Sequence, residues 1–197
     1  MATFEQEVLQ AVSSNKEYQR EVKNLIKNSF ERKKILMLKD FDQHPVTQEL
    51  SSEQSSNISS TLGGYGNLFG FIGFPAGTDP IGPVEEKLKE LVKLESVDFK
   101  FDSVSIKYSA PELDDFDGVA PYRGWREGGN WLKGIERGIS GLGSFRTTLG
   151  EEEKGRSGVG FQLKGKVKSF SGGNNKFQNK KYMTSIVNNF KSSLSTI

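Results

Sequence analysis

Apolar residues recur at three- and four-residue spacing through roughly the first 38 positions of the chain, with charged residues between them. They are Phe4, Val8, Ala11, Val12, Tyr18, Val22, Leu25, Ile26 and Phe30. The pattern predicts one long amphipathic helix, or two helices with a break near Ser13–Asn15, and we expect its apolar stripe to face the core. Ser14 or Asn15 can cap the second helix, with the negative charge of Glu17 in its first turn.

A run of glycine and large apolar residues, from Leu62 to Pro83, follows this helical part. Its aromatic side chains include Tyr65, Phe69, Phe71 and Phe74. Because glycine loses more entropy on folding than any other residue, the run needs surrounding structure to hold it. Two interpretations remain open: the run fills the core of its own domain, or it forms a contact surface between subunits. A membrane-inserting peptide is disfavoured, since the apolar part is shorter than the ~20 helical residues that span a bilayer.

The rest of the chain mixes strand-like and helix-like patterns. Apolar and polar residues alternate from Val97 to Tyr108, which predicts a half-buried antiparallel strand with a bulge or turn at Asp102–Ser103. A second alternating segment, Val159 to Phe170, predicts a strand with one solvated face. The predicted helices are Val84 to Leu94, with Pro83 in its first turn, Trp131 to about Phe145, and Tyr182 to Leu194. The sequence therefore predicts an α+β fold with a long N-terminal amphipathic helix, an antiparallel β-sheet, short helices and a C-terminal helix.

Polar segments separate these elements. His44, the only histidine, precedes Pro45, which should push it into an extended loop. Gln48 to Ser60 is rich in serine, glutamine and asparagine and predicts a surface loop. Pro111 to Tyr122 is acidic, through Glu112, Asp114, Asp115 and Asp117, but it lacks the ligand spacing of a calcium-binding loop. We expect an acidic surface loop there and no metal site.

Two tryptophans lie close together beside arginines, and Trp125, Arg126 and Trp131 are the residue types enriched at the centres of protein interfaces. They predict an anchor between subunits or, as the alternative, a tryptophan pair in the core. Charged residues offer a second kind of contact. Lys164, Lys166 and Lys168 of one subunit are expected to face solvent or the acidic residues of a neighbour, which are Glu151, Glu152 and Glu153 or Asp114, Asp115 and Asp117.

Composition limits the function. The chain has 197 residues, 34% hydrophobic residues, 22 glycines and a mean hydropathy of −0.54, which suits a subunit that completes its burial in an assembly. We expect a single domain over residues 1–197, with a helical arm at 1–40, a Gly/Phe-rich joint at 62–83, and sheet and helices at 84–197. The net charge of +2 gives no strong case for nucleic acid, and zero cysteines exclude disulfides and thiolate metal sites. No signal peptide or transmembrane run is present, so we expect a soluble protein made in the cytoplasm, without a cofactor or membrane partner.

The order of elements resembles that of the head-proximal tail-completion, or neck, proteins of tailed bacteriophages. The likeness rests on the long first helix, the antiparallel sheet and a terminal helix entered through an aromatic-containing segment that begins at Phe177. The runs His44 to Leu50, Gly63 to Phe74 and Trp131 to Ile139 look like segments of phage virion proteins. The chain is longer than the usual tail-completion subunit, with Asp114 to Trp131 as the expected addition. The resemblance implies a ring of copies at the head-tail junction of the virion, in contact with other neck, connector and tail proteins, with DNA at most passing through its lumen.

Two function classes follow. The leading hypothesis is a non-enzymatic structural subunit of such a ring. The alternative is a nucleic-acid-binding protein that uses the C-terminal lysines Lys164, Lys166, Lys168, Lys176, Lys180 and Lys181, although no stacking aromatics of a known motif are interleaved with them. An enzyme is disfavoured because the sequence has no nucleophile motif and no histidine set with metal spacing.

Overall fold

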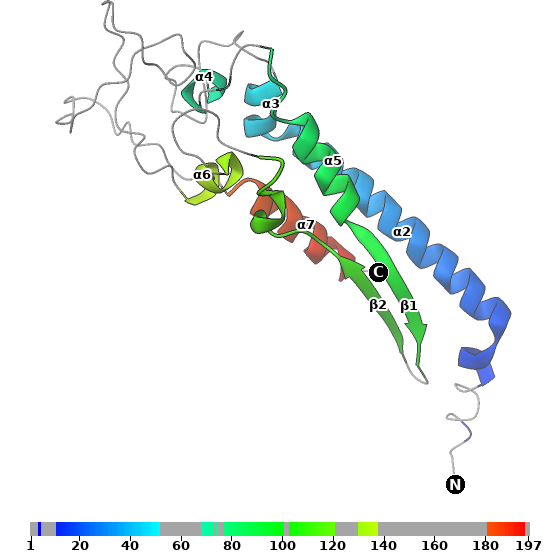
Figure 1. Cartoon of the computed structure of the whole chain (residues 1–197). Helices are drawn as coiled ribbons and strands as arrows, with labels where there is room; N and C mark the ends of the chain where they lie inside the picture. Colours follow the sequence, from blue (N-terminus) through cyan, green and yellow to red (C-terminus); the bar gives the residue numbers. More distant parts are fainter. Residues whose placement is uncertain are drawn as a thin grey trace, which may run out of the picture.

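We describe a computed structural model of residues 4, 11–51, 68–72, 74, 77–100, 103–120, 130–137 and 181–195. The long helix α2 (Lys16–Gln43) runs along the structure, with the hairpin of β1 (Lys93–Phe99) and β2 (Val104–Ser109) beside its N-terminal half (Figure 1). At its other end lie α3 (Pro45–Ser51), α4 (Leu68–Ile72) and α6 (Trp131–Arg137). The remaining elements are α5 (Gly82–Leu91), the 3₁₀ turn η2 (Leu113–Phe116) and α7 (Met183–Leu194). The predicted α+β fold is confirmed.

The start of α2 follows the sequence signal closely. The side chain of Asn15 accepts hydrogen bonds from the backbone N–H groups of Glu17 and Tyr18, at 2.9 and 3.1 Å. A short polar side chain in this position satisfies N–H groups that have no partner inside the helix. The predicted break near residues 13–15 and the cap at Asn15 are therefore confirmed, and α2 continues a few residues beyond the predicted end.

The segment after α2 differs from the predicted loop. His44 has extended backbone angles, φ −64° and ψ 136°, as its position before Pro45 requires. Helix α3 begins at the next residue, so His44 is a one-residue corner between two helices. The prediction of a surface loop from Gln48 is wrong as far as Ser51, because Val46, Thr47 and Leu50 on α3 are buried; residues 52–60 lie outside the described part.

The hairpin presents one apolar face. Its strands are antiparallel, and the pairs Leu94–Tyr108, Val97–Ile106 and Phe99–Val104 place apolar side chains opposite each other. The predicted interruption is confirmed, since β1 ends at Phe99 and the N–H of Lys100 donates to the carbonyl of Ser103 at 2.8 Å. The bulge lies elsewhere, between Leu94 and Ser96. It keeps both ends of β1 in phase with the apolar side of β2.

Two adjacent lysines of α2 hold the ends of other helices. The Nζ of Lys34 donates to the carbonyls of Lys89 and Val92, both at 2.8 Å, where α5 ends. The Nζ of Lys33 donates to the carbonyl of Ser193, near the end of α7. Carbonyls in the last turn of a helix have no partner inside it and carry partial negative charge, so a lysine stabilises them.

The core lies between α2, α7 and the elements at the C-terminal end of α2. Helices α2 and α7 run antiparallel, because Phe41 stacks on Tyr182 at one end and Phe30 meets Phe190 at the other. Pro83 lies in the first turn of α5, as predicted, although this helix ends before Leu94, which is in β1. The core side chains below 2% exposure are Phe30, Phe41, Val46, Leu50, Leu68, Phe69, Ile72, Val84, Leu88, Val92, Phe116, Ala120, Trp131, Leu132, Ile135, Tyr182 and Met183.

Candidate functional site

Three of the aromatic side chains predicted as contacts belong to the core of the chain. Phe69, Phe74 and Trp131 are 0, 3 and 1% exposed. The ring centroids of Phe69 and Phe74 are 5.3 Å apart, and Phe74 meets the edge of Trp131 at 6.0 Å. The structure thus favours the core alternative for these three, and they offer no surface to a neighbour. Tyr65, the side chain of Phe71, Trp125 and Arg126 lie outside the described residues.

Tyr182 is the centre of this aromatic cluster. Its ring stacks with those of Phe41 and Trp131, with ring centroids 5.9 and 6.4 Å apart, and its centroid lies 4.6 Å from that of His44. Its hydroxyl is 2.5 Å from the hydroxyl of buried Thr47. Burial raises the pKa of Tyr182 well above its ordinary value, since the charged phenolate loses its hydration there. The cluster joins α2, α3, α6 and the start of α7, and the polar contacts described for Tyr182 and for the His44 side chain are to groups of the same chain.

The acidic segment is also used within the chain. Lys133 forms ion pairs with Asp114 and Asp117 at 2.8 and 2.6 Å, and these contacts raise the pKa of Lys133. Asn130 donates to Asp117 and caps the start of α6. The carboxylate of Asp115 accepts from the N–H of Glu112 at 2.8 Å. The prediction of a plain surface loop is wrong for residues 113–116, since they form η2 and bury Phe116 completely.

Only some of the residues that were predicted to form electrostatic contacts between subunits lie within the described part of the chain. Asp114, Asp115 and Asp117 are exposed, with their carboxylates directed to partners in the same chain. Glu151, Glu152, Glu153, Lys164, Lys166 and Lys168 lie outside the described residues, as does the predicted strand that carries the lysines. Among the residues that the structure describes, no three acidic or histidine side chains are placed to hold a metal ion.

The surface feature that stands out is apolar and lies on the N-terminal helical segments. Within the described part of the chain, seven large apolar side chains are exposed, and six of them fall between residues 4 and 36. They are Phe4, Val12, Tyr18, Leu25, Ile35 and Leu36, and the seventh is Val104 at the tip of the hairpin. Leu25 and Leu36 are 64 and 58% exposed, which is far more than the core positions Ile26 and Met37 beside them.

Three of these residues, Tyr18, Leu25 and Leu36, lie on one face of α2. We call this face the outer stripe and define it as Tyr18, Val22, Leu25, Ser29, Arg32 and Leu36. At about 100° per residue, all six lie within about 40° of Tyr18 around the helix axis. The buried residues of α2, which are Ile26, Phe30, Met37 and Phe41, lie on another face. The expectation of one core-facing stripe is therefore wrong. The apolar positions of this helix form two faces, and only one of them meets the core.

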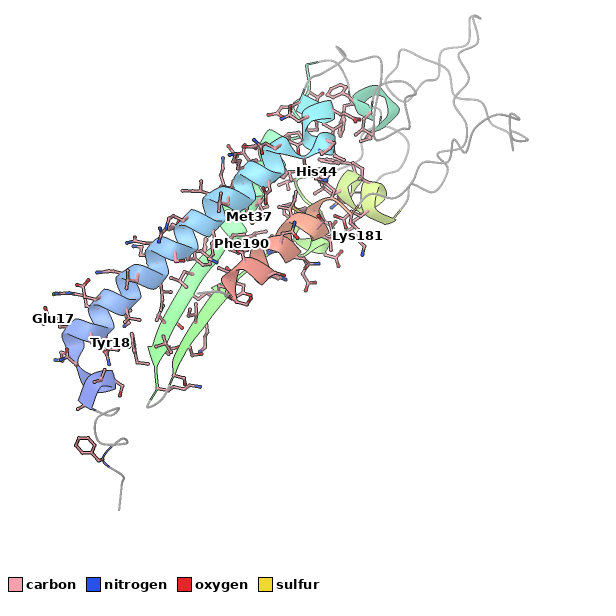
Figure 2. The ribbon with its side chains drawn as sticks, turned by 180° about the vertical axis from the view of Figure 1, so that it is seen from behind. Glu17, Tyr18, Met37, His44, Lys181 and Phe190 are labelled. Carbon is pink, nitrogen blue, oxygen red and sulfur yellow. The ribbon has the colours of Figure 1, made fainter. Side chains whose placement is uncertain are left out.

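One edge of the outer stripe lies beside the hairpin. Tyr18 points toward it and meets the edge of Phe99 at 6.3 Å, whereas Glu17 points away from it (Figure 2). The last turn of α7 and β2 line a shallow hollow of about 220 Å³, through Ile106, Tyr108, Lys191, Leu194 and the adjacent Ser195. Sequence reasoning missed the outer stripe as a surface. The sequence did hold a signal for it, since its apolar residues spread over a wide arc of the helix surface: Tyr18 and Leu25 lie about 100° around the helix axis from Ile26 and Phe30.

Comparison with known proteins leaves the candidate surface to be judged on its chemistry. No protein-family model matches the chain, and neither the curated proteins nor the solved structures include a significant match. In the described part of the chain, no helix combines the length and the apolar character needed to cross a membrane.

Proposed function

We propose that this protein is a non-enzymatic structural subunit that assembles with copies of itself through the outer stripe. The observation that carries the proposal is the exposure of Tyr18, Leu25 and Leu36 along one helix face, at 42, 64 and 58%. Soluble monomers rarely expose contiguous apolar patches larger than a few hundred Å², and larger patches mark interaction sites. Burial of a leucine side chain contributes about 1.5–3 kcal/mol relative to exposure, so a few such residues suffice to drive association.

The setting we propose is the ring at the head-tail junction of a tailed phage, where the subunit joins the capsid connector to the tail. The support is the resemblance in element order, together with the shape of the described part: a long first helix, a two-stranded antiparallel hairpin and a terminal helix packed back on the first (Figure 1). Its partners are then other copies and other neck, connector and tail proteins of the virion, and DNA passes only through the lumen.

The hydrogen bonds that connect distant elements of the described part fit such a role. Its buried polar groups Thr47 and Asn130 have partners within the chain. Lys33 and Lys34 connect α2 directly to the ends of α7 and α5. A subunit of a ring needs faces that hold their relative positions, because ring closure depends on a fixed angle between contacts.

The test is native mass and negative-stain imaging of the purified protein over a wide concentration range. We expect a discrete multimer that appears as a ring at high concentration. The double variant Leu25→Gln and Leu36→Gln should lose the multimer while its stability to urea stays close to that of the wild type, since both side chains are exposed. A matched control replaces Lys27 and Glu31, which are exposed on other faces of α2, with glutamine, and it should assemble normally.

The same experiment separates the nucleic-acid alternative. The lysines on which that alternative depends are, apart from Lys181, outside the described residues. A protein that stays monomeric at every concentration and changes its mass only when DNA is added at moderate salt would contradict the structural proposal. A wild-type ring whose mass ignores DNA supports it.

A further inference from the structure

We infer that the outer stripe binds the outer stripe of a second copy, with the two α2 helices antiparallel. The inference rests on the proposed function, because it names the contact through which the subunit assembles. It depends on three properties of α2 that can be read from the described residues: the spacing of the stripe, the charges along its flank, and the completeness with which two copies cover each other.

The spacing is that of a helix-pairing seam. Successive stripe residues are four, three, four, three and four positions apart, from Tyr18 to Leu36. Each pair of successive steps adds up to seven positions, which is the heptad repeat with which two helices pack side chains into each other's gaps. The seam is roughly 27 Å long at 1.5 Å per residue, which allows several turns of contact. A second copy of α2 is a partner that carries the same spacing and is present at the same concentration.

The charges beside the outer stripe favour antiparallel over parallel pairing of the two helices. On the flank opposite Lys33, the exposed residues Glu17 and Glu21 lie toward the start of α2, and the exposed residues Arg32 and Lys39 lie toward its end. A parallel two-fold pair sets this flank against the other flank of the partner, so Glu17 and Glu21 do not meet Arg32 and Lys39 there. An antiparallel pair centred near residue 27 places Glu21 opposite Arg32 and Glu17 near Lys39, and the two-fold symmetry repeats both contacts.

The contacts that these side chains make inside the subunit leave them able to pair. Arg20 lies 3.7 Å from Glu17 and 3.5 Å from Glu21, with all three side chains more than 60% exposed. Exposed ion pairs of this kind are weak and exchange easily. Arg32 donates through Nε to the carbonyl of Asn28, so its guanidinium lies along the helix beside the seam.

Antiparallel pairing also covers the stripe completely. With the centre near residue 27, Tyr18 meets Leu36, Leu25 meets Ser29, and the apolar stem of Arg32 lies over Val22. A parallel pair shifted by eleven residues also brings Leu25 to Leu36, yet it leaves the Leu36 of one copy and the Tyr18 of the other uncovered. Repetition of that shift grows without closing, whereas the antiparallel contact closes at two copies.

The two-fold contact has a consequence for any larger assembly. Because it closes at two, a ring must use a second contact elsewhere on the subunit, and it must contain an even number of copies. Native mass should therefore show dimers and even multimers, and the double variant Leu25→Gln and Leu36→Gln should shift the population to monomer.

Cysteine cross-linking tests the geometry directly, since the chain contains no cysteine. Asn28 lies on the charged flank close to the proposed two-fold axis, and Lys27 is next to it but faces about 100° away. With a short bismaleimide, we expect Asn28→Cys to give a covalent dimer and Lys27→Cys to give little. The Asn28→Cys product should disappear when Leu25→Gln and Leu36→Gln are added.

Exchange of the charges beside the outer stripe provides a test that is independent of the cross-linking experiment. The variant Glu17→Arg/Glu21→Arg should raise the dimer dissociation constant about tenfold, and Arg32→Glu/Lys39→Glu added to it should restore the affinity. If the wild type assembles but Asn28→Cys and Lys27→Cys cross-link alike, or if the charge exchange has no effect, the antiparallel contact is refuted and the proposed function stands. If the wild type is monomeric at every concentration, both are refuted.

Discussion

The hydrogen bond between Thr47 and Tyr182 offers the sharpest test of how this fold is held together. The two residues are 135 positions apart, and they are 2 and 0% exposed. Their hydroxyl oxygens are 2.5 Å apart, and this is the one hydrogen bond described for the Tyr182 hydroxyl. The variants Tyr182→Phe and Thr47→Val each remove one hydroxyl and nearly preserve the shape of the side chain.

The magnitude follows from what each variant leaves behind. A single substitution removes the hydrogen bond and leaves the other hydroxyl buried without its partner, which costs about 1–3 kcal/mol in the free energy of unfolding. The double variant removes both hydroxyls, so no polar group is stranded. We expect its loss of stability to be smaller than the sum of the single losses by about 1–2 kcal/mol, which is the coupling that a double-mutant cycle measures.

Urea denaturation followed by tryptophan fluorescence measures these values, since Trp131 stacks near Tyr182. Tyr18→Phe is the matched control, because Tyr18 is 42% exposed and its variant should stay within about 0.5 kcal/mol of the wild type. Strictly additive losses for Tyr182→Phe and Thr47→Val would refute the reasoning, as they would show that the two hydroxyls do not depend on each other.

The pH dependence of the free energy of unfolding provides a second test of the buried Tyr182 phenol. Burial raises the pKa of Tyr182 in the folded state above its ordinary value of 10.0. Its contribution to stability is therefore fully present below about pH 10 and is lost as the pH rises beyond that value, at up to about 1.4 kcal/mol per pH unit. The stability difference between the wild type and Tyr182→Phe should narrow above pH 10. A difference that stays constant there would contradict the burial of the phenol.

Two further predictions concern helix ends that are held by distant side chains. Lys34→Met should lower the free energy of unfolding by about 1–2 kcal/mol, because the carbonyls of Lys89 and Val92 lose their donor. The control Lys39→Met, on the exposed face of α2, should have little effect. Equal losses of stability in urea denaturation would refute the capping role of Lys34. Glu136 accepts hydrogen bonds from the N–H and the hydroxyl of Thr184, at 2.7 and 2.5 Å. Glu136→Ala should therefore speed hydrogen exchange in the first turn of α7 about tenfold. Unchanged protection there would show that the start of α7 does not depend on its contact with α6.

The local pattern of the sequence was enough to predict several of the element types, although α3 and η2 lie where it predicted loops. Polar and apolar spacing predicted α2, α7 and an alternating strand with a bulge or turn at Asp102–Ser103, which the structure shows as the two strands of the hairpin. The cap at Asn15, the corner at His44 and Pro83 in the first turn of α5 followed from residues whose backbone preferences act over a few positions. These features depend on local sterics and on hydrogen bonds within one turn, so they need no knowledge of the rest of the fold.

Only the tertiary structure decided which apolar residues are core and which are surface. Phe69, Phe74 and Trp131 looked equally suited to an interface, and they are buried because α2, α3 and Tyr182 close around them. Tyr18 and Leu25 were expected to face the core and are exposed, because α7 and the hairpin cover a different face of the same helix. Burial depends on contacts between segments more than a hundred residues apart, and periodicity within one helix carries no information about which of its faces those segments cover.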